Sequence, residues 1–514
     1  MRRRSRLVAA ALSWLLLLCL LGLPPAGAAP ASQADLQKFL SRFEAYAEKN
    51  RRAFGVPGLS MAVVAGDKLV LLKGLGVTAL GGGRPVDGDT IFQIGSTSKA
   101  FTAAMVAIAA DEKKLAWDDR VIEHLPGFLM QDPWVTREFL VKDLMAQHTG
   151  LAPHAGELQA LFGFGPAHMV ASLAHLSPVT SFRSAFAYQN IPFLAAARMV
   201  SRLSGLDYAQ FLERKIWQPL GMSRTSLPRS GLAQGDNVTR LHRREKGKTV
   251  LLPRDWPYQD WIYLFGPAGG INSTARDMAQ WLRLNINRGE VEGKRLISAA
   301  NVEFMHTPAT PVKVDLADGA LAQYCQAWVY ERHGASPTMV WHNGDTSVNH
   351  AMIAVLPEAK AGLVMLSNLG GVDMLDNLAR YFRDLWGGLE PPDYCAEYLA
   401  KLKEADGKSE LPPRPKSPLP PQPLERYVGR YANPVYETAN VALKGAGLEM
   451  TLGPRRVRME LVPWDRDRFL ARDPADPEML NFLVSFEIGG KGLVERFRAS
   501  GLENEGGGLF RRLP

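Results

Sequence analysis

The chain has little cysteine, with three residues in 514. Cys19 lies in an apolar run near the N-terminus, which leaves Cys325 and Cys395 for the folded part. The sequence leaves open whether these two thiols meet and form a disulfide in an oxidising compartment. The fold therefore does not depend on a framework of disulfides.

The sequence also lacks the patterns of several other kinds of chemistry. His-Glu-x-x-His does not occur, which argues against a zinc metalloprotease, and we expect neither a metal nor a cofactor. Gly247-Lys248-Thr249 lacks the upstream glycine of a phosphate-binding loop. The formal net charge is +8, but no basic stripe with interleaved aromatic residues accompanies it. We therefore expect no nucleic-acid partner.

The long apolar run lies at the N-terminus. Four arginines among the first six residues precede apolar residues 7–23, and a small-x-small site follows at 26–28. This pattern predicts a signal peptide over 1–28, with an uncleaved signal anchor as the alternative. Its removal takes away the four arginines and lowers the net charge from +8 to about +4. We expect an exported protein, periplasmic or extracellular, without stable membrane insertion after cleavage.

The periodicity of the apolar residues divides the rest of the chain into three parts. Over 30–405, strand patterns at both ends enclose a mostly helical middle. This predicts an α+β fold, in which helices and an inserted helical lobe flank one antiparallel sheet. A proline-rich, semi-rigid linker covers 406–423. Short strands between Gly and Asp/Pro turns predict a small all-β, barrel-like domain over 424–514.

The spacing also predicts individual elements. Helices are expected over 35–54, from the Ser96 segment to about 110, and over 193–204, 208–217, 274–282 and 373–386. Strands of the sheet are expected over 59–65, 69–72, 324–330, 339–342, 350–356 and 363–367. Seven strands are expected in the C-terminal part, over 427–431, 440–443, 448–452, 456–461, 468–471, 481–488 and 493–499.

Ser96 and Lys99 are the first candidates for catalysis. A hydroxyl and an amine three residues apart at the start of a helix lie on one face, within side-chain reach. In this geometry a buried lysine can accept the serine proton and leave the oxygen nucleophilic. The alternative is a helix cap beside a solvated lysine. The alanine-rich helix that follows favours close packing, and with it a buried Lys99.

A second candidate group is Tyr188-Gln189-Asn190, between a loop and the next helix. We expect a nearby lysine cation to favour the phenolate of Tyr188, which would let this side chain relay protons. Asn190 can hydrogen-bond both Lys99 and a substrate carbonyl. The alternative is a tyrosine that packs on the helical core, followed by a polar residue at a helix start.

The third candidate group, His342 to Asp345, follows an apolar strand. Gly344 would allow a substrate or another backbone to approach closely. The backbone N–H of Asp345 is then a candidate oxyanion donor, together with the N–H of Ser96. The alternative is a strand-end histidine beside a turn.

These three groups, in this order, match Ser-x-x-Lys, Tyr-x-Asn and Lys/His-x-Gly. They resemble the motifs of the class C β-lactamase-like and penicillin-binding-protein-type serine hydrolases, whose relatives include peptidase S12-like esterases and D-peptidases. Residues 144–151 and 269–278 also resemble stretches of this family. The tail is similar, more loosely, to the lipocalin-like β domain that often follows such hydrolases. The resemblance implies a β-lactamase/transpeptidase-like fold with the site between the sheet and the helical lobe.

The resemblance also implies residue roles. Ser96 would be acylated, Lys99 and Tyr188 would manage its proton, and Asn190 would orient the substrate. His342 occupies the place where β-lactamases of this class carry lysine. This disfavours β-lactams, because a permanent cation suits the β-lactam carboxylate better than an imidazole does. Asp345, if it faces the site, disfavours anionic substrates.

We therefore expect an exported serine hydrolase that forms an acyl-enzyme at Ser96. Its small-molecule or peptide substrate would be a small ester or a D-amino-acid peptide. Two alternatives stay open, namely a weak β-lactamase or D-alanyl-D-alanine carboxypeptidase, and a catalytically silent binder of cell-wall fragments. Gln189 replaces the family's usual small residue, and 324–328 departs from its glycine-rich strand. These departures predict a site rim of different shape.

Overall fold

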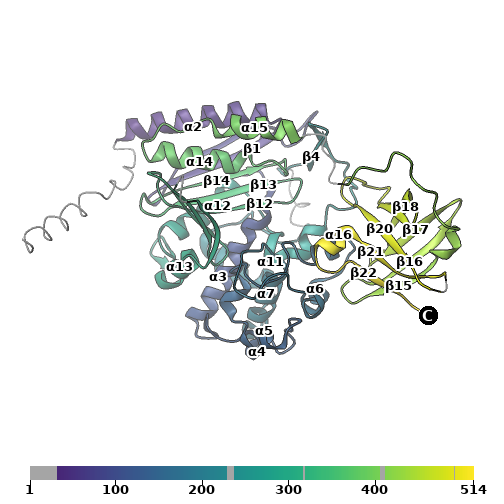
Figure 1. Cartoon of the computed structure of the whole chain (residues 1–514). Coiled ribbons are helices and arrows are strands. Elements are labelled where there is room, and N and C mark those ends of the chain that lie inside the picture. Colours follow the sequence, from purple (N-terminus) through teal and green to yellow (C-terminus); the bar gives the residue numbers. More distant parts are fainter. Residues whose placement is uncertain (1–31, 229–236, 316–318, 406–410, 491) are drawn as a thin grey trace, which may run out of the picture.

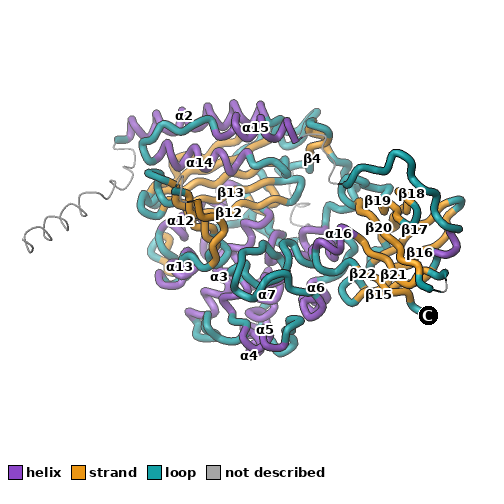
Figure 2. The backbone as a smooth tube through the Cα atoms, in the orientation of Figure 1, coloured by secondary structure: helices purple, strands orange, loops and turns teal. Residues whose placement is uncertain are grey.

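A computed structural model describes residues 32–228, 237–315, 319–405, 411–490 and 492–514. The predicted signal peptide lies outside the described residues, as do residues 406–410 of the predicted linker. The larger part is built on one eight-stranded sheet, here called the main sheet, and the C-terminal part is a closed barrel (Figures 1 and 2). The predicted α+β class with a separate all-β barrel is confirmed.

Strands from two distant stretches of the chain form the main sheet. They are β1 (Gly58–Ala65), β2 (Lys68–Gly76), β9 (Thr310–Asp315), β10 (Ala320–Tyr324), β11 (Val329–His333), β12 (Met339–Asp345), β13 (His350–Leu356) and β14 (Ala361–Ser367). Their order is β2-β1-β14-β13-β12-β11-β10-β9, with antiparallel neighbours throughout. β1 pairs with β14 from Leu59 opposite Ser367 to Ala65 opposite Ala361. The predicted sheet, formed from both ends of the larger part, is confirmed.

Helices cover both faces of the main sheet. On one face lie α2 (Gln33–Ala53), α14 (Met374–Trp386) and α15 (Tyr394–Ala405), shown above the sheet in Figure 1. On the other face, α12 (Ala275–Ile286) and α3 (Ser98–Asp111) pack beneath it. The central strands are therefore buried on both sides. Along β1, Met61 and Val63 pack toward the first helix layer and Ala62 and Val64 toward the second.

The helical lobe connects the two halves of the main sheet. Its helices and helical turns are α4 (Val121–His124), α5 (Pro133–Glu138), η2 (Val141–Leu144), η3 (Glu157–Ala160), α6 (Pro166–Ser172), η4 (Leu173–His175), α7 (Ile191–Ser204), α8 (Tyr208–Leu212), η5 (Glu213–Trp217) and α9 (Gln218–Leu220). Further elements are η6 (Trp261–Phe265), α11 (Gly266–Gly269), α13 (Ala299–His306) and the strand pairs β4 (His242–Glu245) with β5 (Lys248–Leu251) and β7 (Glu290–Val291) with β8 (Lys294–Arg295).

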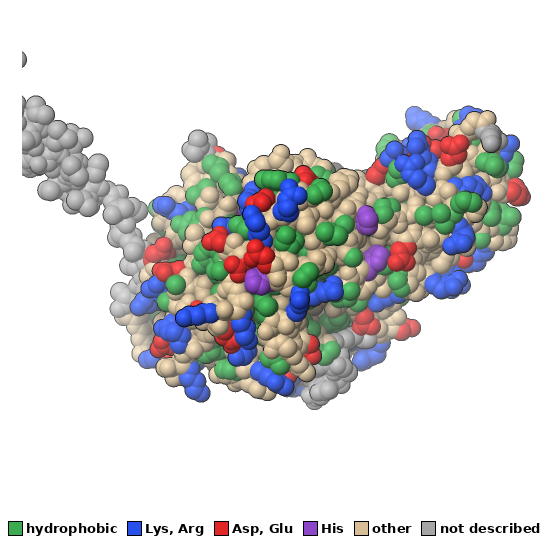
Figure 3. Space-filling model, turned by 90° about the horizontal axis from the view of Figure 1, so that it is seen from below, with side chains coloured by type: hydrophobic (Ala, Val, Ile, Leu, Met, Phe, Trp, Pro, Cys, Tyr) green, Lys and Arg blue, Asp and Glu red, His purple; other side chains and the backbone are tan. Residues whose placement is uncertain are grey.

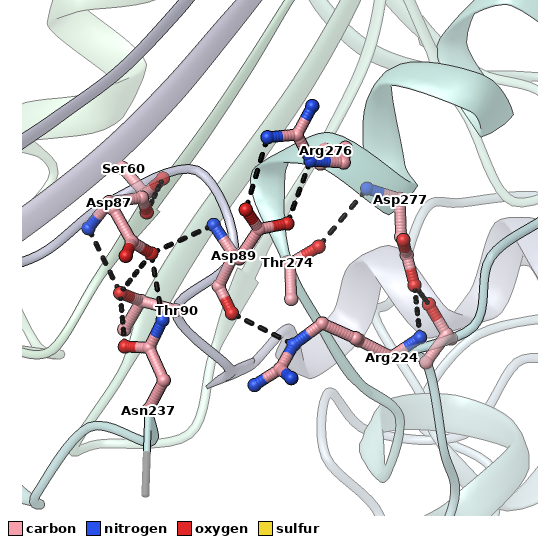
Figure 4. A network of polar contacts seen from close by, with 10 residues as sticks. Ser60, Asp87, Asp89, Thr90, Arg224, Asn237, Thr274, Arg276 and Asp277 are labelled. Atoms are coloured by element: carbon pink, nitrogen blue, oxygen red, sulfur yellow. Dashed lines mark hydrogen bonds and ion pairs between the residues drawn. The ribbon is translucent and has the colours of Figure 1, made fainter. Parts of the chain in front are cut away.

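A polar network anchors the segment that leads to Ser96 (Figure 4). The Asp87 carboxylate accepts hydrogen bonds from the Asp89 backbone at 2.9 Å and from Asn237 Nδ2 at 2.8 Å. Asp89 pairs in turn with Arg276 at the start of α12, at 2.7 Å. The short strand β3 (Phe92–Gln93) then pairs with β6 (Asn272–Ser273) and leads into η1 (Gly95–Thr97). The backbone before Ser96 is thus fixed to two elements that lie far away in the sequence.

The C-terminal part is a closed barrel of eight antiparallel strands. They are β15 (Gly429–Asn433), β16 (Glu437–Lys444), β17 (Gly447–Leu452), β18 (Val457–Asp465), β19 (Arg468–Arg472), β20 (Asn481–Ile488), β21 (Val494–Ala499) and β22 (Leu509–Arg512). The turn η7 (Leu424–Arg426) precedes them, and α16 (Ser500–Asn504) lies between the last two. Seven strands were predicted. β22 was missed because it is only four residues long and follows a run of glycines.

One further prediction of secondary structure is wrong. Residues 324–330 are not one strand, because β10 ends at Tyr324 and β11 begins at Val329. The turn between them is buried, and Cys325 and Trp328 are fully covered. Its sequence is therefore apolar, like that of a buried strand. The helix predicted over 208–217 is confirmed, as α8 continued by a π-helical turn, η5. Cys325 and Cys395 are both free thiols, buried at separate sites.

The described surface carries charges of both signs. On the face shown in Figure 3, Lys and Arg side chains are interspersed with Asp and Glu side chains over both the larger part and the barrel. None of the helices in the described ranges is both long enough and apolar enough to cross a membrane.

Candidate active site

Ser96 lies in η1, and the end of β12 packs directly against the backbone around Gly95. Gly95 has a φ of +51°, and a Cβ added there would meet the Asp345 backbone N at 2.8 Å. A Cβ added at Gly344 would lie 2.1 Å from the Ile94 carbonyl oxygen and 2.7 Å from the Ser96 backbone N. Both positions therefore require glycine. The predicted close approach at Gly344 is made by another stretch of backbone.

Lys99 lies behind Ser96 on the first turn of α3 and is fully buried. Its Nζ lies 3.1 Å from Ser96 Oγ and 2.9 Å from the Ala268 carbonyl oxygen, and it also donates to Asn190 Oδ1. The ammonium stands over the Tyr188 ring, 4.6 Å from its centroid. The alternative of a solvated lysine on an exposed helix turn is therefore excluded.

Burial lowers the pKa of Lys99 to about 7, and the Glu157 carboxylate opposes this shift. Lys99 thus exchanges its proton near neutrality. When the amine is neutral, two N–H bonds suffice for the Asn190 and Ala268 oxygens. The lone pair is then directed at Ser96, which gives Lys99 the position and the basicity of a general base.

Tyr188 precedes α7, and its hydroxyl hydrogen-bonds Ser96. The predicted phenolate is wrong. Complete burial, reinforced by the neighbouring Tyr324, raises the pKa of Tyr188 well above 10. The lysine cation lies over the ring face and does not offset this desolvation. Tyr188 is therefore a neutral phenol that can donate or relay a proton but does not act as an anion.

Gln189, the residue that departs from the family pattern, points away from Ser96. Its side chain is buried, accepts a hydrogen bond from the Thr149 hydroxyl and donates to the Ala152 carbonyl at 3.3 Å. Its backbone N–H donates to Gln147 Oε1 at 2.7 Å. Gln189 thus fixes the loop that carries Tyr188 and leaves Asn190 directed at Lys99.

His342 lies behind the Tyr188 ring and is almost completely buried. Its Nδ1 donates to the Asn343 carbonyl at 2.5 Å, and its Nε2 accepts from the Tyr324 hydroxyl at 2.9 Å. Burial, together with the Lys99 charge, lowers the pKa of His342 to about 3. His342 is therefore a neutral imidazole with both nitrogens occupied, and it supplies no positive charge to the site.

Asp345 ends β12 and borders the same cavity as Ser96. Its carboxylate accepts hydrogen bonds from the backbone N–H groups of Ser347 and Gly371. The contact between Gly95 and Gly344 holds the Asp345 N–H beside the Ser96 N–H. The role of these two N–H groups as oxyanion donors stays a prediction.

The cavity at Ser96 has a volume of about 420 Å³. Its lining includes the predicted site residues Tyr188, Asn190 and Asp345, together with Asn343. The predicted residue His342 does not line it. The cavity also has lining residues that the sequence analysis missed, which are His154, Glu157, Trp261, Ile262, Phe265, Ala268, Gly269 and Ser347. Most of them come from loops and short helical turns without periodicity. The positive φ of His154, +60°, is visible only in the structure.

His154 and Glu157 form the charged part of this rim. His154 Nδ1 lies 2.9 Å from Glu157 Oε2, and this pairing raises the pKa of His154. One cluster elsewhere in the described residues, Asp119 with Glu123 and His124, has ligand-type atoms within 4.8 Å of one another. None of these three residues lines the Ser96 cavity.

Comparison with known proteins matches the two parts separately. The Beta-lactamase family matches residues 43–385, and a domain of unknown function, DUF3471, matches residues 413–505. The chain is 26% identical to unguisins hydrolase ungD' of Aspergillus campestris over 425 residues, which is 75% of this chain and 74% of that protein. It is 28% identical to penicillin-binding protein 4 of Amycolatopsis lactamdurans over 363 residues, which is 69% of this chain and 90% of that protein.

Solved structures share the fold. An octameric penicillin-binding protein homologue from Pyrococcus abyssi superposes with a TM-score of 0.60 at 20% identity, covering 90% of this chain and 98% of that one. A class C beta-lactamase superposes with a TM-score of 0.56 at 18% identity, covering 69% of this chain and 97% of that one.

Proposed function

The chain belongs to the Beta-lactamase family of serine hydrolases, and from this premise we propose that it is an exported hydrolase working through an acyl-enzyme at Ser96. Its substrates are small esters or amides, including D-amino-acid peptides. The observation that carries the proposal is the fully buried Lys99, whose amine lies 3.1 Å from Ser96 Oγ and has a pKa of about 7.

The reaction begins when neutral Lys99 accepts the proton of Ser96. The Ser96 oxygen forms a bond to the substrate carbonyl carbon, and the carbonyl oxygen takes the negative charge. The backbone N–H groups of Ser96 and Asp345 stabilise this oxyanion. When the tetrahedral adduct collapses, the bond to the leaving group breaks, and the proton that Lys99 accepted from Ser96 passes through Tyr188 to the leaving group. A water molecule then attacks the acyl-enzyme in the same way and frees Ser96.

The charges around the cavity support substrates without an essential carboxylate. His342 is neutral, and the carboxylates of Glu157 and Asp345 belong to residues that line the cavity. Glu157 is paired with His154, and β12 supplies no cation that could bind an anionic group. Esters and uncharged or amino-bearing peptides therefore fit the cavity better than β-lactams do. The names of the two relatives, a hydrolase and a penicillin-binding protein, agree with this general class.

The experiment compares Ser96→Ala with Ser98→Ala. Ser98 belongs to the same turn, but its hydroxyl accepts a hydrogen bond from the Ile271 backbone at 3.2 Å and has no place in the proposed reaction. Turnover of p-nitrophenyl esters should vanish in Ser96→Ala and stay within about tenfold of wild type in Ser98→Ala. Intact-protein mass spectrometry should detect an acyl group on a peptide that contains Ser96.

The outcome also separates the alternatives. Full ester turnover in folded Ser96→Ala would exclude the proposal. Rapid nitrocefin hydrolysis by the wild type would favour a β-lactamase instead. A folded wild type that neither turns over esters nor reacts with an active-site phosphonate would indicate a catalytically silent binder.

A further inference from the structure

Two walls of the Ser96 cavity are tied to the C-terminal barrel. The first wall is η3 with the preceding loop, which brings His154 and Glu157 to the rim. Glu505, just after α16, receives the backbone N–H of Leu158 on its Oε2 at 2.9 Å. Its carbonyl oxygen accepts the N–H of Gly156 at 3.3 Å. In Figure 1, α16 lies where the barrel meets the helical lobe.

The barrel holds this first wall at further points along the chain. The Arg455 N–H donates to the Phe162 carbonyl at 3.0 Å, and Gly453 lies so close that an added Cβ would be 2.5 Å from the same oxygen. His168 Nε2 donates to the Val435 carbonyl at 2.9 Å. The stretch from 156 to 168 is therefore fixed to the barrel over its whole length.

The second wall is η6, which contributes Trp261, Ile262 and Phe265 to the cavity. The segment just before η6 is bound by the barrel loop between β19 and β20. Asp476 Oδ2 accepts hydrogen bonds from Trp256 Nε1 and from Arg243 Nη1, both at 2.6 Å. The Tyr258 hydroxyl donates to Asp473. The Trp261 N–H in turn donates to the Tyr258 carbonyl at 3.3 Å, which links the bound segment to η6.

The acidic side chains in these two attachments are well shielded from water. Asp473 and Asp476 are 7% and 3% exposed, and Glu505 also accepts the Tyr436 hydroxyl at 3.2 Å. Hydrogen bonds of this kind, to buried carboxyl groups, are costly to break because the partners are left without water. The barrel thus binds both walls. Glu505 binds the first wall, and the Asp473–Asp476 loop binds the segment that leads into the second.

We propose that the C-terminal barrel sets the width of the entrance to the Ser96 cavity and thereby decides which acyl groups the enzyme accepts. This inference rests on the proposed function, since it concerns the substrate of the same serine. η3 and η6 are short helical turns, and they contact each other beside the cavity. Turns of this length have little stability of their own. Their separation therefore depends on the segments that attach them, and the barrel binds η3 directly and η6 through the residues that precede it. Glu505 and Asp476 are positioning residues in this scheme.

The test uses the full chain with one substitution on each wall. Glu505→Ala removes the acceptor of the Leu158 N–H on the first wall, and Asp476→Asn weakens the acceptor of Trp256 and Arg243 on the second wall. Asp467→Asn is the matched control, because Asp467 accepts the Tyr427 hydroxyl within the C-terminal part and does not touch the larger part. The readout is the ratio of kcat/KM for a long-chain and a short-chain p-nitrophenyl ester. We expect this ratio to rise about fivefold in both wall variants and to change less than about twofold in the control.

Hydrogen exchange read by mass spectrometry shows whether the walls have loosened. Exchange over 156–168 should accelerate in Glu505→Ala, and exchange over 256–265 in Asp476→Asn. If exchange accelerates but both ester ratios stay at the wild-type value, the barrel does not set specificity and the inference is overturned. Unchanged exchange in both wall variants overturns it as well. Should one variant fail to fold, the other still tests its own wall.

Failure of the proposed function would be recognised separately. A wild type that hydrolyses neither ester contradicts the proposed hydrolase, whatever the barrel does. Exchange then decides the inference alone, with faster exchange in the wall variants supporting a barrel-held entrance and unchanged exchange overturning it.

Discussion

The two sides of the cavity at Ser96 contrast in what they supply. The helical side supplies functional side chains, namely Lys99 and Tyr188, which transfer protons, and Asn190, which hydrogen-bonds Lys99. The sheet side supplies backbone, through the close contact of Gly344 with the Ser96 segment, and a histidine that does not titrate near neutrality. Lys99 and His342 are both buried bases with lowered pKa values, of about 7 and about 3.

The contrast shows that burial alone does not determine a catalytic role. The same desolvation brings the pKa of Lys99 down from 10.5 to neutrality and takes the pKa of His342 from 6.5 out of the useful range. Residue type sets the starting value, and burial then decides which base remains available. The helical side should therefore be sensitive to side-chain chemistry and the sheet side to backbone geometry.

The largest effect is expected from Lys99→Met, which removes the base but keeps an unbranched side chain in the buried site. The kcat for p-nitrophenyl esters should fall by about 1000-fold or more, since general-base and nucleophile activation are lost together. Removing a buried cation should leave the melting temperature equal or higher. Steady-state kinetics and thermal melts measure the two effects, and a kcat close to wild type would show that Lys99 is not the base.

Gly344→Ala tests the sheet side. The new Cβ would lie 2.1 Å from the Ile94 carbonyl oxygen, so the two backbones must separate. We expect a loss of about 1–3 kcal/mol in the free energy of unfolding and a fall of about 100-fold in kcat from the displaced N–H groups. Gly127→Ala is the control, because its Cβ would meet nothing within 4 Å. Equal activity and stability of the two variants would contradict the backbone role of Gly344.

The smallest effect concerns pH. Because Lys99 must be neutral to accept a proton, kcat/KM should rise with pH around 7, where the buried Lys99 amine has its pKa. The Glu157 carboxylate raises the pKa of Lys99, so Glu157→Gln should move this rising limb of the profile to lower pH. A pH–rate profile of both proteins measures the shift. A limb that moves upward would contradict the assignment to Lys99.

The part of the candidate site formed by residues close together in the sequence was predictable. Ser96 and Lys99 meet because they are three residues apart at a helix start, and the order of the motifs indicated the rest. The state of Tyr188 was predicted wrongly, because neither its burial in the core nor the neighbouring Tyr324 can be seen in the local sequence. Glu157 was missed for a related reason. It reaches the cavity only through a turn that the barrel holds in place.

The same distinction applies to the fold. The hairpin β1–β2 and strands β12 to β14 carry clear apolar patterns, and their pairing followed from the layer architecture. The region from β9 to β11 was predicted wrongly because its buried turn at Cys325–Trp328 has the composition of a strand. Closure of the barrel by β22 was missed, since pairing of a four-residue strand depends on tertiary contacts.

The pairing of β1 with β14 has a consequence for the order in which the enzyme becomes competent. The centre of the main sheet forms only when Leu59 pairs with Ser367, which lies far away in the sequence. Contacts this remote in sequence form late, after the local helices. Until the sheet has formed, the end of β12 does not pack against Gly95. Lys99 is then incompletely buried, so its pKa stays high and the amine keeps its proton. In a nascent or partly unfolded chain the Ser96 hydroxyl is therefore not activated. We expect hydrolytic activity only from the fully folded protein.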